Sequence, residues 1–113
     1  MIKGKTALVT GANRGIGLSI VKKFLENQCN VIACTRKSDA ESLKNLNELN
    51  NEFPKKIKIY SFDLKGLDEN NSSLNKLLEE NKNIDILINN AGQNHVALFL
   101  MTKIEKFKEI FDI

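Results

Sequence analysis

The sequence is poor in several residue types that mark particular classes of protein. Its 113 residues include no tryptophan, one proline, one tyrosine, one histidine and six glycines. This composition excludes a collagen-like chain and leaves little room for long flexible linkers. A chain of this length buries roughly 60–70% of its unfolded surface, so it can form one modest core. A two-domain enzyme is excluded.

Cysteine is scarce as well, with only Cys29 and Cys34. We predict that they mark the start and end of one short strand, where five extended steps separate their Cα atoms by about 16 Å, too far for a disulfide. Two thiols without a bridge are typical of a reducing compartment, so we expect a cytoplasmic protein. Together with His95 they match no zinc-ligand spacing, and the sequence predicts no metal site.

Long apolar runs are missing. Residues 1–5 contain no apolar core of a secretory signal. No run elsewhere approaches the roughly 20 residues that cross a bilayer. We therefore expect no secretory signal and no membrane partner.

Positive charges slightly outnumber negative ones, 17 against 14, for a formal net charge of +3. Fifteen of the cations are lysines, and the two arginines are Arg14 and Arg36. A modest excess fits an anionic small ligand as well as a nucleic-acid surface. Because aromatic residues are few and no nucleic-acid motif is present, we expect no nucleic-acid partner.

Two spacings of apolar residues alternate along the chain. Short apolar runs, which indicate buried strands, occur at 6–9, 31–34, 57–62 and 84–88. Helical spacing follows each run, which predicts helices over 16–25, 39–53, 68–78 and 102–111.

Local signals support the helix boundaries. Ser38 or Asp39 can cap the second helix, and Pro54 stops it. Asp68 and Thr102 can cap the third and fourth helices. The alternation predicts βαβ units, a parallel sheet and right-handed crossovers. We predict an α/β fold, a Rossmann-type three-layer sandwich with about four parallel strands in the order 3-2-1-4, as one half-domain over residues 1–113.

A glycine-rich turn separates the first predicted strand from the first helix. It reads Thr10-Gly11-Ala12-Asn13-Arg14-Gly15-Ile16-Gly17. Glycines here allow a tight turn, a close backbone approach to a pyrophosphate and close packing of helix on strand. The free N–H groups of the helix's first turn then face the phosphates. The alternative interpretation is a glycine-rich turn without a ligand.

The spacing G-x-x-x-G-x-G after Thr10 resembles the short-chain dehydrogenase/reductase family, and most of all its beta-ketoacyl-acyl-carrier-protein reductases. Asn89-Asn90-Ala91-Gly92 follows the fourth strand, as N-N-A-G does in that family. Asp63-Leu64 ends the third strand, where the family places a residue that contacts the adenine. The resemblance implies that Asn90 contacts the cofactor ribose and that the backbone of Ala91 and Gly92 passes close by. The alternative for this loop is an ordinary turn.

The residues after the second strand bear on the choice of nicotinamide cofactor. NAD-binding units usually place Asp or Glu there, but this sequence reads Cys34-Thr35-Arg36-Lys37. Arg36 would attract a 2′-phosphate and can bind it bidentately. Arg14 lies at the other position where the family favours the phosphorylated cofactor, so we predict NADP(H). The predicted cofactor-binding residues are Thr10, Gly11, Asn13, Arg14, Gly15, Ile16, Gly17, Thr35, Arg36, Asp63, Leu64, Asn90, Ala91 and Gly92.

The resemblance implies hydride transfer between NADP(H) and a carbonyl or alcohol, such as reduction of a 3-oxoacyl-acyl-carrier protein. The family uses Asn, Ser and a Tyr-x-x-x-Lys pair, in which the Lys cation lowers the Tyr pKa. Tyr60 is followed four residues later by Leu64. By register, the family's Asn would come immediately after Ile113. We therefore predict no catalytic residue in this chain and no activity from it alone.

Three other interpretations stay open. The chain can be a non-catalytic dinucleotide-binding or interaction module, or a gene fragment completed by another chain. A basic RNA-binding domain is the third. The family resemblance implies homo-oligomers for full-length relatives and allows complementation by a C-terminal half. Ile84–Ile88 would then form an apolar open edge that can pair with another chain.

Overall fold

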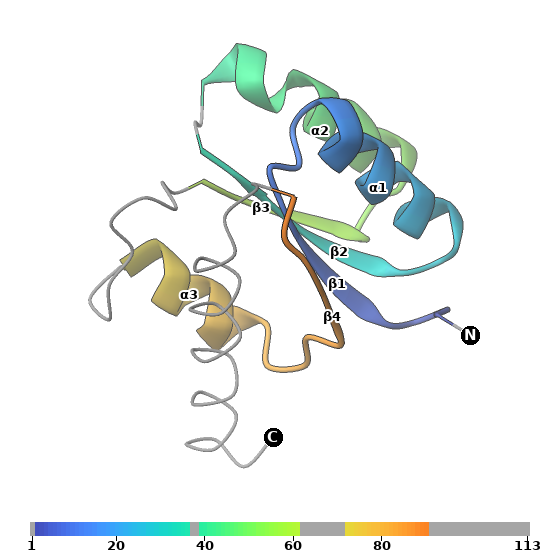
Figure 1. Ribbon diagram of the computed structural model, residues 1–113, viewed down its shortest axis with the longest axis vertical. Coiled ribbons are helices and arrows are strands. Elements are labelled where there is room, and N and C mark those ends of the chain that lie inside the picture. The colour runs from blue at the N-terminus through green and yellow to red at the C-terminus, as the bar shows by residue number, and fades with distance from the viewer. Residues whose placement is uncertain (1, 37–38, 62–71, 91–113) are drawn as a thin grey trace.

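Strands and helices alternate along the chain, as the apolar pattern predicted. The structure, a computed structural model, describes residues 2–36, 39–61 and 72–90. Its elements are β1 (Thr6–Thr10), α1 (Gly15–Glu26), β2 (Asn30–Thr35), α2 (Ala40–Glu52), β3 (Ile57–Ser61), α3 (Ser72–Glu80) and β4 (Ile86–Ile88) (Figure 1). The α/β class is confirmed.

The four strands form one sheet in the order β3-β2-β1-β4. β1 pairs in parallel with both β2 and β4, and β2 pairs in parallel with β3. Leu8 of β1 therefore lies between Ile32 of β2 and Leu87 of β4. The predicted strand order 3-2-1-4 is confirmed, and the carboxyl ends of all four strands meet at one edge.

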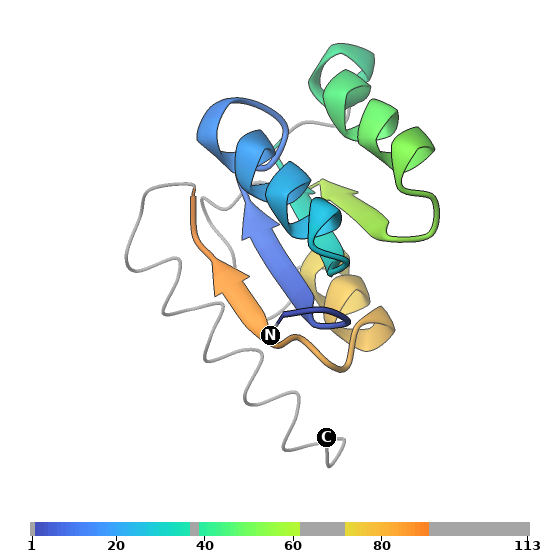
Figure 2. The ribbon, with the colours of Figure 1, turned by 90° about the vertical axis from the view of Figure 1, so that its right-hand side faces the viewer.

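Helices cover both faces of the sheet, which makes three layers (Figure 2). One buried cluster joins Val9 and Val31 to residues of α1 and α2, such as Val21 and Leu46. A second cluster joins Leu8, Ile32 and the α3 residues Leu74, Leu77 and Leu78. Neighbouring strand residues enter opposite clusters because side chains alternate across a sheet.

The boundaries of α2 follow the predicted signals. The Asp39 carboxylate accepts a hydrogen bond of 2.9 Å from the Ser42 N–H, which caps the helix start. The helix ends at Glu52, two residues before Pro54. The predicted caps Asp68 and Thr102, and the predicted helix over 102–111, lie outside the described residues.

β4 is shorter than predicted, covering Ile86–Ile88 rather than 84–88. Asp85 gives the reason, because its carboxylate Oδ2 accepts the Thr6 N–H at 2.9 Å where a backbone carbonyl would otherwise do so. The Asp85 N–H in turn donates to the Thr6 carbonyl at 2.9 Å. Ile84, just before this pair, is buried in the cluster under α3.

The two cysteines are free and buried. Cys34 lies in β2, whereas Cys29 precedes the strand and donates from its Sγ to the Ile2 carbonyl at 3.2 Å. Burial raises the pKa of Cys34 to about 12, so its thiol stays protonated at neutral pH. The prediction of two unbridged thiols is confirmed, although Cys29 lies one residue outside the strand that it was expected to start.

Candidate functional site

The glycine turn joins the carboxyl end of β1 to the start of α1, at the edge where the strands end. Gly11 and Gly15 have φ angles of +60° and +58°, in the left-handed region that favours glycine. A Cβ on Gly15 would meet no atom within 4 Å. Gly15 is therefore required by its backbone conformation and not by a lack of space.

Gly17 has the opposite requirement. A Cβ at this position would collide with the Gly11 carbonyl oxygen and lie 2.6 Å from Nδ2 of Asn90. That amide nitrogen donates a hydrogen bond of 3.1 Å to the same Gly11 oxygen. Gly17, in the first turn of α1, thus packs against Gly11 of the glycine turn and against Asn90. This contact leaves no room for a side chain at Gly17.

The start of α1 has no capping side chain. Its N-cap residue Arg14 makes no side-chain capping hydrogen bond, and the first turn carries no acidic residue. α2 differs on both counts, since Asp39 caps it and Glu41 lies in its first turn. The N-terminal N–H groups and the positive end of the α1 dipole can therefore act on an external anion.

Two exposed side chains border this helix start. Ile16, a large apolar side chain, is 73% exposed. Arg14 is exposed beside it. An apolar and a cationic group thus stand together at the uncapped helix end, a combination that suits a ligand with both phosphate and ring surfaces.

The ends of β1 and β4 are joined by side-chain hydrogen bonds. Thr10, which is fully buried, donates from Oγ1 toward the Asn89 Oδ1 at 3.1 Å and the Ile88 carbonyl at 3.5 Å. Asn89, which follows β4, is therefore held against the end of β1. This link places Asn90 beside Gly11 although 79 residues separate the two in sequence.

β2 ends beside the same turn. The Ala12 N–H donates to the Cys34 carbonyl at 3.1 Å, which ties the glycine turn to this strand. The next residue, Thr35, is 2% exposed, and its hydroxyl lies 2.9 Å from that of Ser61 at the end of β3. Arg36 follows immediately and is exposed. Ala12 and Ser61 were not singled out by the sequence analysis, although Ser61 ends its strand directly opposite Thr35.

Most predicted site residues thus lie along one edge of the sheet. The structure brings Gly11, Gly17 and Asn90 into contact. Thr10 ends the strand just before them, and the adjoining turn and helix start contain Asn13, Arg14, Gly15 and Ile16. Thr35 and Arg36 stand at the neighbouring strand end. The predicted residues Asp63, Leu64, Ala91 and Gly92 lie outside the described residues.

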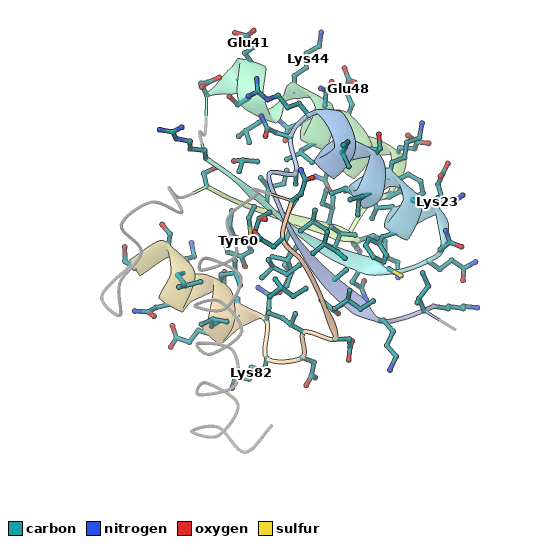
Figure 3. The ribbon with its side chains drawn as sticks, viewed as in Figure 1. Lys23, Glu41, Lys44, Glu48, Tyr60 and Lys82 are labelled. Atoms are coloured by element: carbon teal, nitrogen blue, oxygen red, sulfur yellow. The ribbon has the colours of Figure 1, made fainter. Side chains whose placement is uncertain are left out.

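Tyr60 belongs to a different cluster, on the α3 side of the sheet (Figure 3). Its hydroxyl donates to the Glu80 carboxylate at 2.7 Å and accepts from Asn81 Nδ2 at 2.9 Å. Partial burial and the hydrogen bond to Glu80 raise the Tyr60 pKa to about 12. A phenol with a raised pKa, hydrogen-bonded to a carboxylate, is suited to joining β3 to α3 and not to donating a proton near neutral pH.

Other classes of site are not found in the part of the chain that the structure describes. No three His, Cys, Asp or Glu side chains within residues 2–36, 39–61 and 72–90 are grouped so that they could hold a metal ion. Among the helices of these same ranges, none is long and apolar enough to cross a membrane.

Comparison with known families and proteins agrees with this geometry. The family model described as short chain dehydrogenase matches residues 5–113. A 3alpha-hydroxysteroid dehydrogenase of Mediterraneibacter gnavus is 36% identical over 116 residues, covering 100% of this chain and 45% of its own length. A 3-oxoacyl-[acyl-carrier-protein] reductase of Aquifex aeolicus is 34% identical over 116 residues, covering 99% and 45%. The chain therefore spans less than half the length of these relatives.

Solved structures show the same fold. L-sorbose reductase of Gluconobacter frateurii, in complex with NADPH and L-sorbose, matches with a TM-score of 0.68 and 26% identity, over 81% of this chain and 35% of that one. The 3-oxoacyl-[acyl-carrier protein] reductase of Brucella melitensis, in complex with NAD, matches with a TM-score of 0.64 and 30% identity, over 80% and 34%. The relatives named here are thus oxidoreductases, and the two structures contain different nicotinamide cofactors.

Proposed function

The chain belongs to the short-chain dehydrogenase family, and on that premise we propose that it is the NADP(H)-binding part of an oxidoreductase. The cofactor site is the corner formed by the glycine turn, the start of α1 and the ends of β2 and β4. The predicted residues of this corner, together with Asp63, Leu64, Ala91 and Gly92, form the proposed cofactor-binding set within a half-domain over residues 1–113.

One observation carries the proposal: α1 begins with no capping side chain, next to a turn that a Cβ at Gly17 would block. A pyrophosphate placed there would accept hydrogen bonds from the first-turn N–H groups and lie at the positive end of the helix dipole. The residues present therefore fit the phosphates of a dinucleotide. The exposed Ile16 would supply apolar contact to the same ligand.

The preference for NADP(H) rests on two arginines, one at the start of α1 and one after the end of β2. Arg36 follows β2 directly, where an acidic residue would repel a 2′-phosphate, and Arg14 stands at the start of α1. Both arginines are exposed at the carboxyl edge of the sheet. Guanidinium groups can bind a phosphate through two parallel hydrogen bonds. A nicotinamide cofactor supplies or accepts hydride when bound, and these residues would hold and select it.

The reaction of the complete protein is proposed from its relatives. Their names include a 3-oxoacyl-[acyl-carrier-protein] reductase and a hydroxysteroid dehydrogenase, so we propose hydride transfer between NADP(H) and a carbonyl or alcohol. The 113 residues contain no Tyr-x-x-x-Lys pair. Residues beyond these 113 would supply the proton donor, either from a longer polypeptide or from a second chain. The complete protein is proposed to lie in the cytoplasm and to form homo-oligomers.

The alternative is a dinucleotide-binding or interaction module that performs no chemistry. It is favoured by the one tyrosine of the sequence, since Tyr60 is held by Glu80 and Asn81 on the α3 side of the sheet. The two proposals share the cofactor site and differ in turnover.

Calorimetric titration of the 113-residue protein with NADPH and with NADH tests the site and the preference. We expect NADPH to bind at least tenfold more tightly. Equal affinities, or tighter binding of NADH, would overturn the NADP(H) preference, and binding of neither would overturn the dinucleotide site. NADPH oxidation with carbonyl substrates, measured with and without the remaining C-terminal portion of a relative, separates the reductase from the module.

A further inference from the structure

We infer that the hydroxyl pair Thr35–Ser61 is a positioning device that sets cofactor specificity through Arg36. This inference rests on the proposed function, because it assigns a role within the same cofactor site. Thr35 belongs to the proposed cofactor-binding set, and Ser61 is its hydroxyl partner outside that set. They would act by fixing the backbone from which the Arg36 side chain reaches the 2′-phosphate.

The pair lies at the last register position of two adjacent strands. Thr35 ends β2, Ser61 ends β3, and the two residues are direct partners across the ladder. Their hydroxyl oxygens are 2.9 Å apart, and Thr35 is 2% exposed. A buried hydroxyl costs free energy unless it is hydrogen-bonded, so a polar residue in this place needs a specific partner.

The end of β2 is held from both sides. On the β1 side, the Ala12 N–H of the glycine turn donates to the Cys34 carbonyl at 3.1 Å. On the β3 side, Ser61 holds the next residue, Thr35, through its hydroxyl. Arg36 is the first exposed residue beyond these two anchors. Its backbone is therefore fixed relative to the glycine turn, where the phosphates of the cofactor would bind.

Binding of a 2′-phosphate by a guanidinium depends on direction. A bidentate contact requires two donors to face two oxygens at once, and a small shift of the backbone removes that alignment. NADH lacks the 2′-phosphate, so the shift would not change its affinity. Loss of the hydroxyl pair should therefore weaken NADPH binding and leave NADH binding nearly unchanged, which a general loss of stability would not do.

The test compares four variants of the full 113-residue protein, with dissociation constants for NADPH and NADH measured by calorimetry. Thr35→Val keeps the shape of the side chain and removes its hydroxyl, whereas Ser61→Ala removes the partner from a half-buried position on the strand at the edge of the described sheet. Thr35→Ser keeps the hydroxyl. Tyr60→Phe is the matched control, because it removes a hydrogen-bonded hydroxyl from the neighbouring residue of β3 on the α3 side.

We expect the ratio of the NADH to the NADPH dissociation constant to fall at least threefold in Thr35→Val and in Ser61→Ala. It should stay near the wild-type value in Thr35→Ser and Tyr60→Phe. If Thr35→Val does not fold, Ser61→Ala alone decides. The chemical shift of the Arg36 backbone amide gives a second readout and should move in Ser61→Ala but not in Tyr60→Phe.

An unchanged ratio in Ser61→Ala, or an equal fall in affinity for both cofactors, would overturn the inference while leaving the proposed function intact. Equal dissociation constants of the wild-type protein for NADH and NADPH would instead reject the NADP(H) preference, and with it this inference. The wild-type titration thus separates the failure of one from the failure of the other.

Discussion

The side-chain amide of Asn90 donates a hydrogen bond of 3.1 Å to the carbonyl oxygen of Gly11, across 79 residues of sequence. Gly17 is pressed against both partners of this bond. The contact therefore fixes the glycine turn from outside the βαβ unit to which the turn belongs. The phosphate site proposed above lies at this helix start, where the first N–H groups have no acceptor within the helix. The contact would hold these N–H groups in place for the phosphates.

Replacing glycines within the turn should separate the two reasons for their presence. Gly17→Ala would drive a methyl group into the Gly11 carbonyl, and overpacking of this kind costs about 3 kcal/mol. Gly15→Ala meets no atom and costs about 1–2 kcal/mol for its left-handed backbone. Urea denaturation measures both costs. Equal stability of the Gly17→Ala and Gly15→Ala variants would contradict the close contact.

Asn90→Asp should weaken the turn through the loss of one donor. A carboxylate oxygen would replace Nδ2 opposite the Gly11 carbonyl, and an unmade hydrogen bond at this half-buried site costs about 1–2 kcal/mol. The free energy of unfolding should fall, and the NADPH dissociation constant should rise. Asn83→Asp makes the same chemical change at an exposed position and should change neither. Equal effects of the two substitutions would reject the proposed role of Asn90.

Arg14→Gln and Arg36→Gln should each lower NADPH affinity while leaving NADH affinity within about twofold. Hydrogen bonds to charged groups contribute about 1.5–3 kcal/mol, and exposure places these residues at the lower end, roughly a tenfold loss of affinity. Lys23→Gln is the control, since it removes an exposed cation from the last turn of α1, far from the helix start. Calorimetric titration checks the three variants. Equal losses of affinity for NADPH and NADH would show that the arginines do not bind the 2′-phosphate.

Tyr60 should titrate with a pKa of about 12 in the folded protein, against 10.0 for the free side chain. Because the folded pKa is the higher one, the folded state binds more protons between pH 10 and 12. The contribution to stability is complete below pH 10 and is lost as the pH rises toward 12.

With one tyrosine and no tryptophan, absorbance at the phenolate band follows this group directly. Glu80→Gln removes the carboxylate that accepts the hydrogen bond from the Tyr60 hydroxyl, and it should lower the observed pKa of Tyr60 toward 10. A wild-type titration centred near pH 10 would refute the hydrogen-bonded environment of Tyr60.

Much of the fold could be predicted because its signals are local. Apolar runs such as 31–34 and the cap Asp39 act within a few residues, and the structure has a strand and a helix start where they indicated. The predicted start of β4 was wrong by two residues because Asp85 bonds to Thr6, a partner 79 residues away. Spacing along the chain contains no sign of such a substitution of side chain for backbone.

The candidate site divides in the same way. That glycines and two arginines follow the first two strands can be predicted from the chain alone, since spacing and charge are properties of the chain. The reason for each glycine follows only from the fold, in which Gly15 has open space and is needed for its backbone conformation, whereas Gly17 faces Gly11 and Asn90 and has no room for a side chain. The fold also makes Ser61 the partner of Thr35. These contacts depend on how distant strands are placed side by side, and that placement is set by packing of the whole sheet rather than by any local run of residues.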